Sequence, residues 1–371
     1  MKNYKRIVIK IGSGVLDCAQ NQFDLPVLKN IVDQLAELKK SGVDICIVTS
    51  GAVSSGMREL KLTKKPGEIT EKQALAAIGQ GKLIHTYATL FASHNITIAQ
   101  VLLSREDLEK RRRFLNARNT LQKLFESKVI PIINENDSVA TEELRYGDND
   151  LMSSLVSIKI DAELLILLTT VDGLFDKNPL KNPEARIISA IENFDEKYYQ
   201  MSDKRTSLFG SGGMASKLEA AHMAVKAGIQ VHIANGKRRG IIRDILDSKP
   251  VGTRICSQKC DLSSREKWII YNSSSRGKNV TVDDGAYEAL MLKGKSLLPS
   301  GIISVEGQFR EGDIIKVVNQ KGKIFAKGFT SYSSTEIEKI MGQKSSNIEN
   351  ILGYCTSSEV IHRNNMVLLK E

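Results

Sequence analysis

The feature that most constrains this sequence is an alternation between two hydrophobic patterns from residue 6 to residue 234. Short runs rich in β-branched residues, too brief for an ordinary helix, indicate buried strands, and longer segments with helical spacing separate them. Strands are predicted at 6–11, 44–48, 97–103, 129–133, 163–168 and 229–234, and helices at 25–40, 71–93, 105–125, 151–160 and 214–227. Strands that alternate with helices predict an α/β fold, with a parallel sheet covered by helices on both faces.

The pattern changes between residues 247 and 265. Beyond that stretch the hydrophobic segments are short and alternating, and glycines are closely spaced, as in a small β-rich domain with tight turns. A chain of 371 residues is long enough for two domains. We therefore predict an α/β domain over residues 1–260 and a β-rich domain over residues 261–371.

Composition excludes several classes of protein. Hydrophobic residues make up 41% and charged residues 26%, values typical of a soluble globular protein. No apolar run approaches the ~20 residues of a membrane span, and the start of the chain lacks the pattern of a secretory signal, so we expect a cytoplasmic protein. Five scattered cysteines are interpreted as reduced structural thiols, and neither they nor the histidines have the spacing of a metal site.

Carboxylates and amides gather where the predicted strand 129–133 ends. The first cluster is residues 134–137 (NEND), and a second, residues 147–150 (GDND), leads into the predicted helix 151–160. Open α/β folds bind ligands at the carboxyl edge of the sheet, where such loops lie. A solvated acidic loop is the alternative for this stretch taken alone, but phosphate-binding features elsewhere favour a ligand site.

Two further features point to a bound phosphate. Three glycines within residues 210–213 precede the predicted helix at Met214, and Lys217 lies about one turn inside it. Backbone amides at a helix start bind anions, although a flexible turn with an ordinary lysine is the alternative. Lys10 lies within an apolar strand, where a lysine leans into a polar cleft or, alternatively, points to water from an edge strand. The P-loop and GxGxxG patterns are absent.

The formal net charge of +10 suits either nucleic acid or anionic small substrates. The most basic run, residues 110–113, follows acidic residues within a helical pattern, which favours a solvated helix face over nucleic-acid contact. Residues 261–371 hold 15 Lys and Arg against 13 Asp and Glu, so most of the excess lies in the first domain. An RNA-binding protein needs a basic surface and remains a rival interpretation.

Taken together, these stretches resemble the glutamate 5-kinase family, which has the amino acid kinase fold. The matching segments, in family order, are VIKIGSGVL, VTSGAVSSGM, AAIGQGKLI, RFLNARNTL, PIINENDSVA, GDNDLMSSLV, GSGGMASK and AGIQVHIANG. The tail resembles a PUA domain through VDDGAYEAL, KGKSLLPSGI, EGQFREGDII and IFAKGFTSYSSTEI. The resemblance implies ATP-dependent phosphorylation of the side-chain carboxylate of L-glutamate to L-glutamyl 5-phosphate, the first step of proline biosynthesis. Another carboxylate kinase of the same fold is the alternative.

The resemblance also implies roles for individual residues. Lys10 and Lys217 are the expected phosphate-contacting pair, and Asp150 is the carboxylate that orients them. The expected glutamate-binding residues are Ser50, Asp137 and Asn149, with Gly51, Asn134 and Asp148 close by. The expected ATP-binding residues are Lys10, Thr169, Thr170, Ser211, Gly212, Gly213, Met214, Ala215, Ser216 and Lys217. Thr170 stands where members often have Asp, and Asn178 where Asp before Pro is usual.

The implied chemistry agrees with these residue types. A carboxylate with a pKa near ~4.3 is already ionised at neutral pH, so no general base is required. The difficulty is electrostatic, because an anion attacks the γ-phosphate of ATP and positive charge must gather around it. Mg²⁺ is expected to be held mainly by ATP phosphates and water. The resemblance further implies proline as feedback inhibitor, a homo-oligomer, and glutamyl-phosphate reductase as a partner. The lack of a long apolar run predicts no membrane association.

Overall fold

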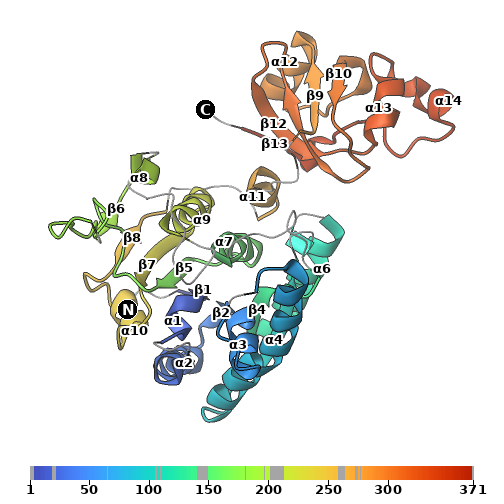
Figure 1. The fold of residues 1–371 in the computed structure, drawn as a ribbon. Helices are drawn as coiled ribbons and strands as arrows, with labels where there is room; N and C mark the ends of the chain where they lie inside the picture. Colours follow the sequence, from blue (N-terminus) through green and yellow to red (C-terminus); the bar gives the residue numbers. More distant parts are fainter. Residues whose placement is uncertain are drawn as a thin grey trace. The chain divides into compact units, whose positions relative to one another are not determined.

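The computed structural model describes residues 4–18, 22–64, 66–104, 107–108, 111–139, 149–179, 181–195, 197–200, 213–257, 264–271, 275 and 277–369. Contacts between residues divide the chain into two compact units (Figure 1). The first unit comprises residues 1–108 and 115–261, and the second comprises residues 109–114 and 262–371. The exact limit at residue 260 stays a prediction, and each unit is described by itself.

The first unit is built on one eight-stranded sheet, in the order β3-β4-β2-β1-β5-β7-β8-β6. Every pairing is parallel except β7 with β8, which confirms the predicted parallel sheet. The strands are β1 (Arg6–Ile11), β2 (Asp44–Val48), β3 (Ile98–Leu103), β4 (Ile130–Glu135), β5 (Leu164–Thr169), β6 (Ala190–Ile191), β7 (Gln230–Asn235) and β8 (Thr253–Ile255). The sequence patterns missed β6 and β8, because two or three residues are too few to establish a period.

The helices of this unit follow the predicted pattern, with ends shifted by a few residues. They are α1 (Ser13–Leu16), α2 (Leu25–Lys40), α3 (Ala52–Glu59), α4 (Ile69–Ala92), α6 (Arg111–Glu126), α7 (Asn149–Lys159), α8 (Lys197–Gln200), α9 (Met214–Lys226) and α10 (Ile241–Leu246), although residues 111–114 of α6 are assigned to the second unit. The pattern did not predict α1, α3, α8 and α10, which span eight residues or fewer. The helix predicted over residues 105–125 begins in a stretch where residues 105, 106, 109 and 110 lie outside the described residues.

Side-chain alternation along β1 sends its residues to two different environments. Ile7, Ile9 and Ile11 belong to a fully buried hydrophobic core with residues of α2, α4 and α10. Because successive side chains of a strand point to opposite faces, Lys10 points to the other face, where α7 packs against β1 and β5. The strand period therefore directs one lysine of an otherwise apolar strand toward α7.

The second unit is the predicted β-rich domain. Its five strands lie in the order β10-β9-β11-β12-β13, antiparallel except for β9 with β11. The strands are β9 (Asn279–Val282), β10 (Ile302–Glu306), β11 (Ile314–Val318), β12 (Ile324–Phe329) and β13 (Met366–Leu368). The helices are α11 (Ser264–Tyr271), α12 (Asp284–Lys293), α13 (Ser334–Ile340) and α14 (Ile348–Leu352), with short 3₁₀ turns at Pro299–Gly301, Ser345–Asn347 and Arg363–Asn365. Asp283 and Ser333 cap α12 and α13 through their side chains.

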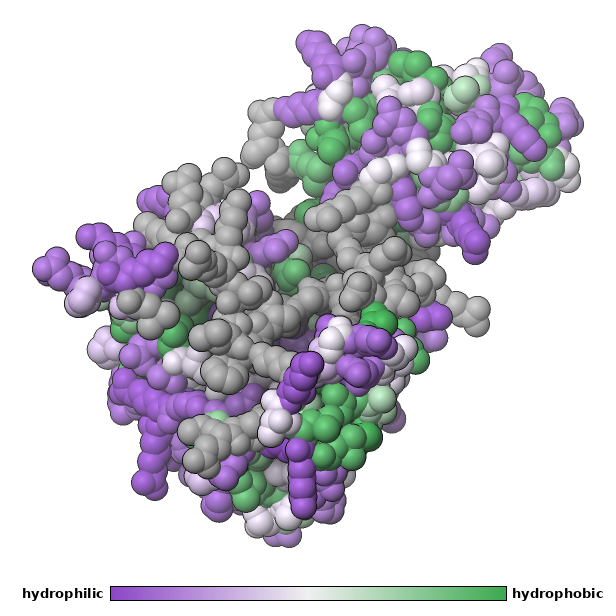
Figure 2. Space-filling view, viewed as in Figure 1, coloured by the Kyte–Doolittle hydropathy of each residue, from purple (hydrophilic) through white to green (hydrophobic). Residues whose placement is uncertain are grey.

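On the coloured part of the surface in Figure 2, hydrophilic residues predominate and hydrophobic residues lie in separate patches. Of the helices that the structure describes, none combines the length and the hydrophobicity needed to cross a membrane. The four described cysteines are free thiols. Cys46 is buried in β2, and this burial raises the pKa of its thiol far above the usual range.

Candidate active site

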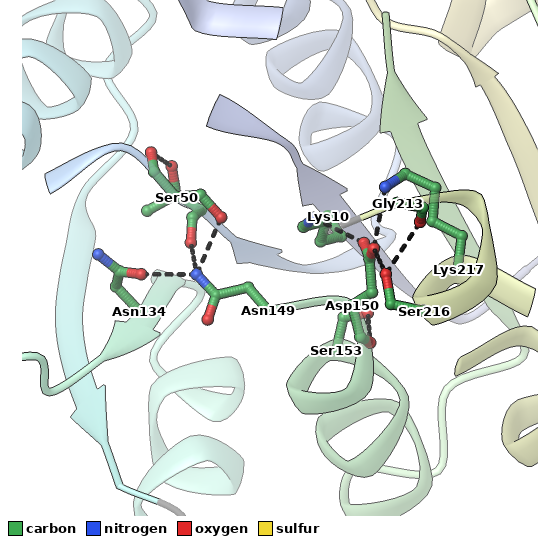
Figure 3. A network of polar contacts seen from close by, with 10 residues as sticks. Lys10, Ser50, Asn134, Asn149, Asp150, Ser153, Gly213, Ser216 and Lys217 are labelled. Atoms are coloured by element: carbon green, nitrogen blue, oxygen red, sulfur yellow. Dashed lines mark hydrogen bonds and ion pairs between the residues drawn. The ribbon is translucent and has the colours of Figure 1, made fainter. Parts of the chain in front are cut away.

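A carboxylate held between two ammonium groups forms the centre of the site (Figure 3). Lys10 Nζ lies 2.6 Å from Asp150 Oδ1, and Lys217 Nζ lies 3.0 Å from Asp150 Oδ2. Ser216 Oγ also donates to Asp150 Oδ2, at 3.2 Å. Asp150 is 0% exposed, Lys10 3% and Lys217 6%. The structure therefore brings together the three residues predicted to be catalytic.

Three different elements deliver these side chains to one point. Lys10 is the penultimate residue of β1, Asp150 lies in the first turn of α7, and Lys217 lies in the first turn of α9. Removing charges from water is costly unless they are paired, which explains why the buried groups converge. One carboxylate faces two ammonium groups, so the three side chains together carry one net positive charge. Such a cluster attracts an anion.

A chain of amides occupies the other half of the site (Figure 3). Asn149 Nδ2 donates to the carbonyl oxygen of Thr49 at 2.6 Å, to Ser50 Oγ at 2.9 Å and to Asn134 Oδ1 at 2.8 Å. Thus the predicted substrate residues Ser50, Asn134 and Asn149 meet at the carboxyl ends of β2 and β4, where α7 begins. Among the described residues, Asn149 Oδ1 is buried and has no hydrogen-bond partner. An acceptor in this position is suited to a bound donor.

Gly51 sets the direction of the chain beside this pocket. It has φ +101° and immediately precedes α3. Glycine reaches this left-handed conformation without the steric cost of a Cβ. The turn leaves Ser50 Oγ facing Asn149, because the chain reverses into α3 directly after it. The prediction that Gly51 lies close to the substrate residues is consistent with this position.

The loop after β1 approaches the site through its backbone. A Cβ on Gly12 would lie 3.9 Å from Lys10 Nζ, and one on Gly14 would lie 3.0 Å from Cγ2 of Thr170. Thr169 is the last residue of β5 and is buried, whereas the side chain of Thr170 is exposed. The two predicted threonines therefore lie at the carboxyl end of β5, with Thr170 next to the glycine loop.

The start of α9 has the form of an anion site. Gly213 is its N-cap and offers no side chain to cap the helix, so the first-turn amides of Met214, Ala215 and Ser216 are not satisfied by a capping side chain. Lys217 adds its charge in the same turn. The predicted residues Ser211 and Gly212 lie outside the described residues.

The two remaining predicted substrate residues are Asp137 and Asp148. Asp137 lies in the turn that follows β4 and is half-buried. Asp148 lies outside the described residues, as does the adjoining stretch 140–147. The roles assigned to the site residues stay predictions.

The sequence patterns missed residues of α3 and α4 that support the site residues. Gln80 of α4 is buried, and its Oε1 accepts a hydrogen bond from Asn134 Nδ2 at 2.7 Å. Gly79 and Gly56 allow α4 and α3 to pack backbone to backbone, since a Cβ on Gly79 would lie 1.9 Å from the Ala52 carbonyl oxygen. The segment AAIGQGKLI contains Gly79 and Gln80, but its local pattern indicates only a helix.

The far end of α7 holds a further buried cation. Lys159 is 1% exposed, and its burial lowers the pKa of its ammonium group to about 7 despite the nearby Asp107 carboxylate. Lys159 Nζ lies 3.5 Å from the carbonyl oxygen of Asp107, whose carboxylate accepts hydrogen bonds from the backbone and hydroxyl of Ser104. The helix that carries Asn149 and Asp150 is thus tied at its other end to the segment after β3.

The carboxylate at the centre of the site is already engaged by two ammonium groups, which makes it a poor direct metal ligand. In the part of the chain that the structure describes, no group of three or more His, Cys, Asp or Glu side chains has the arrangement of a metal site. A divalent cation that accompanies a nucleotide fits this arrangement when phosphate oxygens and water supply its ligands.

Comparison with known proteins shows which family the chain belongs to. The model of the amino acid kinase family matches residues 5–235, and that of the PUA domain matches residues 278–352. The chain is 47% identical to the glutamate 5-kinase of Maridesulfovibrio salexigens, over 99% of this chain and 97% of that protein. It is 45% identical to that of Syntrophotalea carbinolica (100% and 99% covered) and 44% identical to that of Shewanella halifaxensis (99% and 98% covered). The chain therefore belongs to the amino acid kinase family and, within it, to the glutamate 5-kinases that carry a PUA domain.

Proposed function

We propose that this protein transfers the γ-phosphoryl group of ATP to the side-chain carboxylate of L-glutamate, giving L-glutamyl 5-phosphate and ADP, as the first step of proline biosynthesis. The observation that carries the proposal is the convergence of Lys10 and Lys217 on the buried Asp150. This cationic centre lies beside an amide pocket, since Asn149 and Asp150 are adjacent in α7. The identity to glutamate 5-kinases over almost the whole chain favours glutamate as acceptor.

The two lysines supply the charge that the reaction requires. An oxygen of the glutamate side chain forms a bond to the γ-phosphorus, while the bond from that phosphorus to the β–γ bridging oxygen breaks and leaves ADP. Negative charge is spread over the transferring group as this happens. Lys10 and Lys217 approach from two elements and stabilise that charge, and Asp150 holds their ammonium groups in place. A single well-aimed donor of this kind contributes roughly 3–4 kcal/mol.

The amide pocket holds the amino acid. We assign the unpaired Oδ1 of Asn149 and the carboxylate of Asp137 to the α-ammonium group of glutamate, and the hydroxyl of Ser50 to a carboxylate oxygen. Gly51, Asn134 and Asp148 complete this assignment. The groups bind before any chemistry, so their main effect is to hold the nucleophile in line with the γ-phosphate.

The nucleotide is assigned to the edge formed by β5 and the start of α9. Thr169, Thr170 and residues 211–217 are its proposed contacts, with the amides of the α9 N-terminus facing phosphate oxygens. Mg²⁺, held by those oxygens and water, supplies further neutralisation of the phosphate charge when bound. Thr170 contributes a neutral hydroxyl to this proposed edge.

The remaining assignments follow the family. We propose a kinase domain over residues 1–260 and a PUA domain over residues 261–371, a homo-oligomeric cytoplasmic enzyme, and delivery of the labile acyl phosphate to a glutamyl-phosphate reductase. Proline is proposed to inhibit by competing near the glutamate site. Inhibition by proline is expected to weaken as the glutamate concentration increases. Activity that is unchanged at high proline concentration would exclude this proposal.

The proposed reaction is tested by incubating the purified protein with MgATP and a panel of acceptors: L-glutamate, N-acetylglutamate, aspartate, carbamate and UMP. Hydroxylamine in the assay traps an acyl phosphate as a hydroxamate, which separates carboxylate phosphorylation from simple ATP hydrolysis. Glutamate-dependent formation of both ADP and hydroxamate is expected. An enzyme that uses another acceptor of the panel and ignores glutamate would overturn the proposal.

A further inference from the structure

The amide chain at the site has a fixed polarity that backbone groups determine. A carboxamide has one end that accepts hydrogen bonds and one that donates them. The backbone N–H of Glu135, which can only donate, lies 2.9 Å from Asn134 Oδ1. The carbonyl oxygen of Thr49, which can only accept, lies 2.6 Å from Asn149 Nδ2. Each asparagine therefore has its oxygen and nitrogen assigned by an independent neighbour.

This polarity leaves the nitrogen of Asn134 in need of an acceptor. Asn134 is 1% exposed, so its Nδ2 has little access to water. Gln80 Oε1 supplies the acceptor at 2.7 Å, from a side chain that is itself 9% exposed. If Asn134 turned over, its nitrogen would face both the Glu135 N–H and the Asn149 amide nitrogen, which are donors. Gln80 is thus the group that makes the observed orientation fully satisfied.

The orientation of the Asn134 amide is matched by that of the Asn149 amide. Asn134 Oδ1 accepts from Asn149 Nδ2 at 2.8 Å, and the same nitrogen is directed at Thr49 and Ser50. With its nitrogen committed, Asn149 leaves Oδ1 buried and without a partner among the described residues. The side chain of Gln80 therefore acts two residues away from the atom that we assign to the substrate ammonium group.

We infer that Gln80 is a positioning residue for the amino-acid substrate: it supplies the acceptor that the backbone-determined polarity of the Asn134–Asn149 amide pair requires, and it thereby stabilises the arrangement in which Asn149 presents an acceptor to the α-ammonium group. This inference deepens the proposed function and rests on it. In this arrangement Gln80 acts on the substrate through Asn134 and Asn149. Its loss should therefore weaken amino-acid binding and leave the phosphoryl-transfer step largely intact.

The inference is tested with Gln80→Met, which keeps the length of the side chain and removes the acceptor. KM for glutamate is expected to rise about tenfold, equivalent to about 1.4 kcal/mol, with kcat and KM for ATP changing less than about twofold. A double-mutant cycle with Asn134→Ala should be strongly non-additive, because Gln80 acts through Asn134. Full multiplication of the two effects in the double variant would overturn the inference.

Gln34→Met is the matched control. Gln34 is also a buried glutamine of the first unit, 8% exposed, and its Oε1 accepts from the backbone amides of Ile242 and Arg243 instead of from the site. The control should lower the melting temperature but leave KM for glutamate within about twofold of the starting protein. An equal rise in KM for Gln34→Met and Gln80→Met would show a general structural effect and would also overturn the inference.

Two further arrangements keep the result decisive. If Gln80→Met does not fold, Gln80→Asn replaces it. The asparagine side chain is shorter by one methylene, so its oxygen lies beyond direct reach of Asn134. An unchanged KM for glutamate in Gln80→Asn would contradict the inference. The unsubstituted enzyme reports on the proposed function separately. If it used a different amino acid, the same cycle run with that acceptor would still measure the effect of Gln80.

Discussion

Asn149 and Asp150 are consecutive residues, yet their side chains belong to two different polar networks. Asn149 donates to Thr49, Ser50 and Asn134, whereas Asp150 lies between two lysine ammonium groups. In the first turn of a helix, adjacent residues point in directions about 100° apart. One helix start therefore serves both halves of the site and fixes the distance between them (Figure 3).

This arrangement explains why the start of α7 must be well placed. The reacting carboxylate and the γ-phosphate have to meet in line, and each half of the site holds one of them in the proposed reaction. The helix is buried along much of its length and packs against β1, β5 and α9. In the proposed reaction, α7 thus sets the position of glutamate, held in the amide pocket, relative to the γ-phosphate, held by the lysines.

Lys217→Met should separate catalysis from amino-acid binding. The substitution removes one ammonium group from the transferring phosphate, so kcat should fall by about 100-fold or more. KM for glutamate should change less than about threefold, because the amide pocket is untouched. Steady-state kinetics with each substrate varied would measure both effects, and near-normal turnover would remove Lys217 from the mechanism.

Lys226→Met is the matched control for that variant. Lys226 lies on the same helix, at its last turn, and its side chain is exposed. It loses the same charge and gains the same methionine away from the site. Its kcat is expected to stay within about twofold, so a large loss in both variants would point to a general charge effect on α9.

Asn149→Asp should disable the amide pocket through a single atom. The substitution replaces the donating nitrogen by an oxygen, which would face the Thr49 carbonyl and Asn134 Oδ1, both of them acceptors. Repulsion between buried acceptors costs a few kcal/mol, so KM for glutamate should rise by about 100-fold. KM for ATP should remain nearly unchanged, and isothermal titration with each ligand provides the check. Equal weakening of both ligands would contradict the division of the site.

The fold could be predicted from sequence where patterns were long enough to read. The strands β1, β2 and β5 consist mainly of buried apolar residues, and they were predicted within one residue of their observed ends. The antiparallel direction of β8 was not predicted, because three residues carry no information about the strand they pair with. Strand direction depends on how the chain returns to the sheet, which no local pattern records.

The site was predictable to a different degree. Composition and spacing indicated a phosphate site near the start of α9 and a polar edge after β4. The pairing of Lys10 with Asp150 came from the family resemblance, since 140 residues of sequence separate them. Gln80 was missed for the same reason: its contact with Asn134 depends on the packing of α4 near the end of β4, and its own segment indicates only a helix.

Lys159 should make stability depend on pH in a defined direction. Its pKa is lowered to about 7 from the ordinary lysine value of 10.5 by burial, so between these two values the unfolded chain binds more protons than the folded one. The free energy of unfolding should therefore rise with pH from about 7 to about 10.5. Below pH 7 Lys159 is charged in both states, so the full cost of burying its ammonium group applies. Relative to Lys159→Met, the unsubstituted protein should be less stable by a few kcal/mol at pH 6, with the gap narrowing toward pH 10.

Urea unfolding of both proteins at pH 6, 7.5 and 9 measures that difference. Groups that titrate in both proteins cancel in the comparison, so the remaining pH dependence belongs to Lys159. A constant gap across this range would show that Lys159 keeps its ordinary pKa in the folded protein. A gap that widens with pH would reverse the sign of the argument.

The contact between α3 and α4 gives a prediction about two glycines of the same helix. A Cβ on Gly79 would lie 1.9 Å from the Ala52 carbonyl oxygen and 2.3 Å from the Gly56 nitrogen, and backbone atoms cannot move aside as a side chain can. Gly79→Ala should therefore cost about 1–3 kcal/mol of stability. It should also raise KM for glutamate, because α3 begins directly after Ser50 and Gly51.

Gly81→Ala is the opposite case. A Cβ there meets nothing within 4 Å, so the substitution should stabilise the helix by about 0.5–1 kcal/mol through its intrinsic propensity. Thermal unfolding and glutamate kinetics of the two variants give a direct comparison, since they make the same chemical change two residues apart. If Gly79→Ala were as stable as Gly81→Ala, the close packing of α3 on α4 would not be what positions the substrate loop.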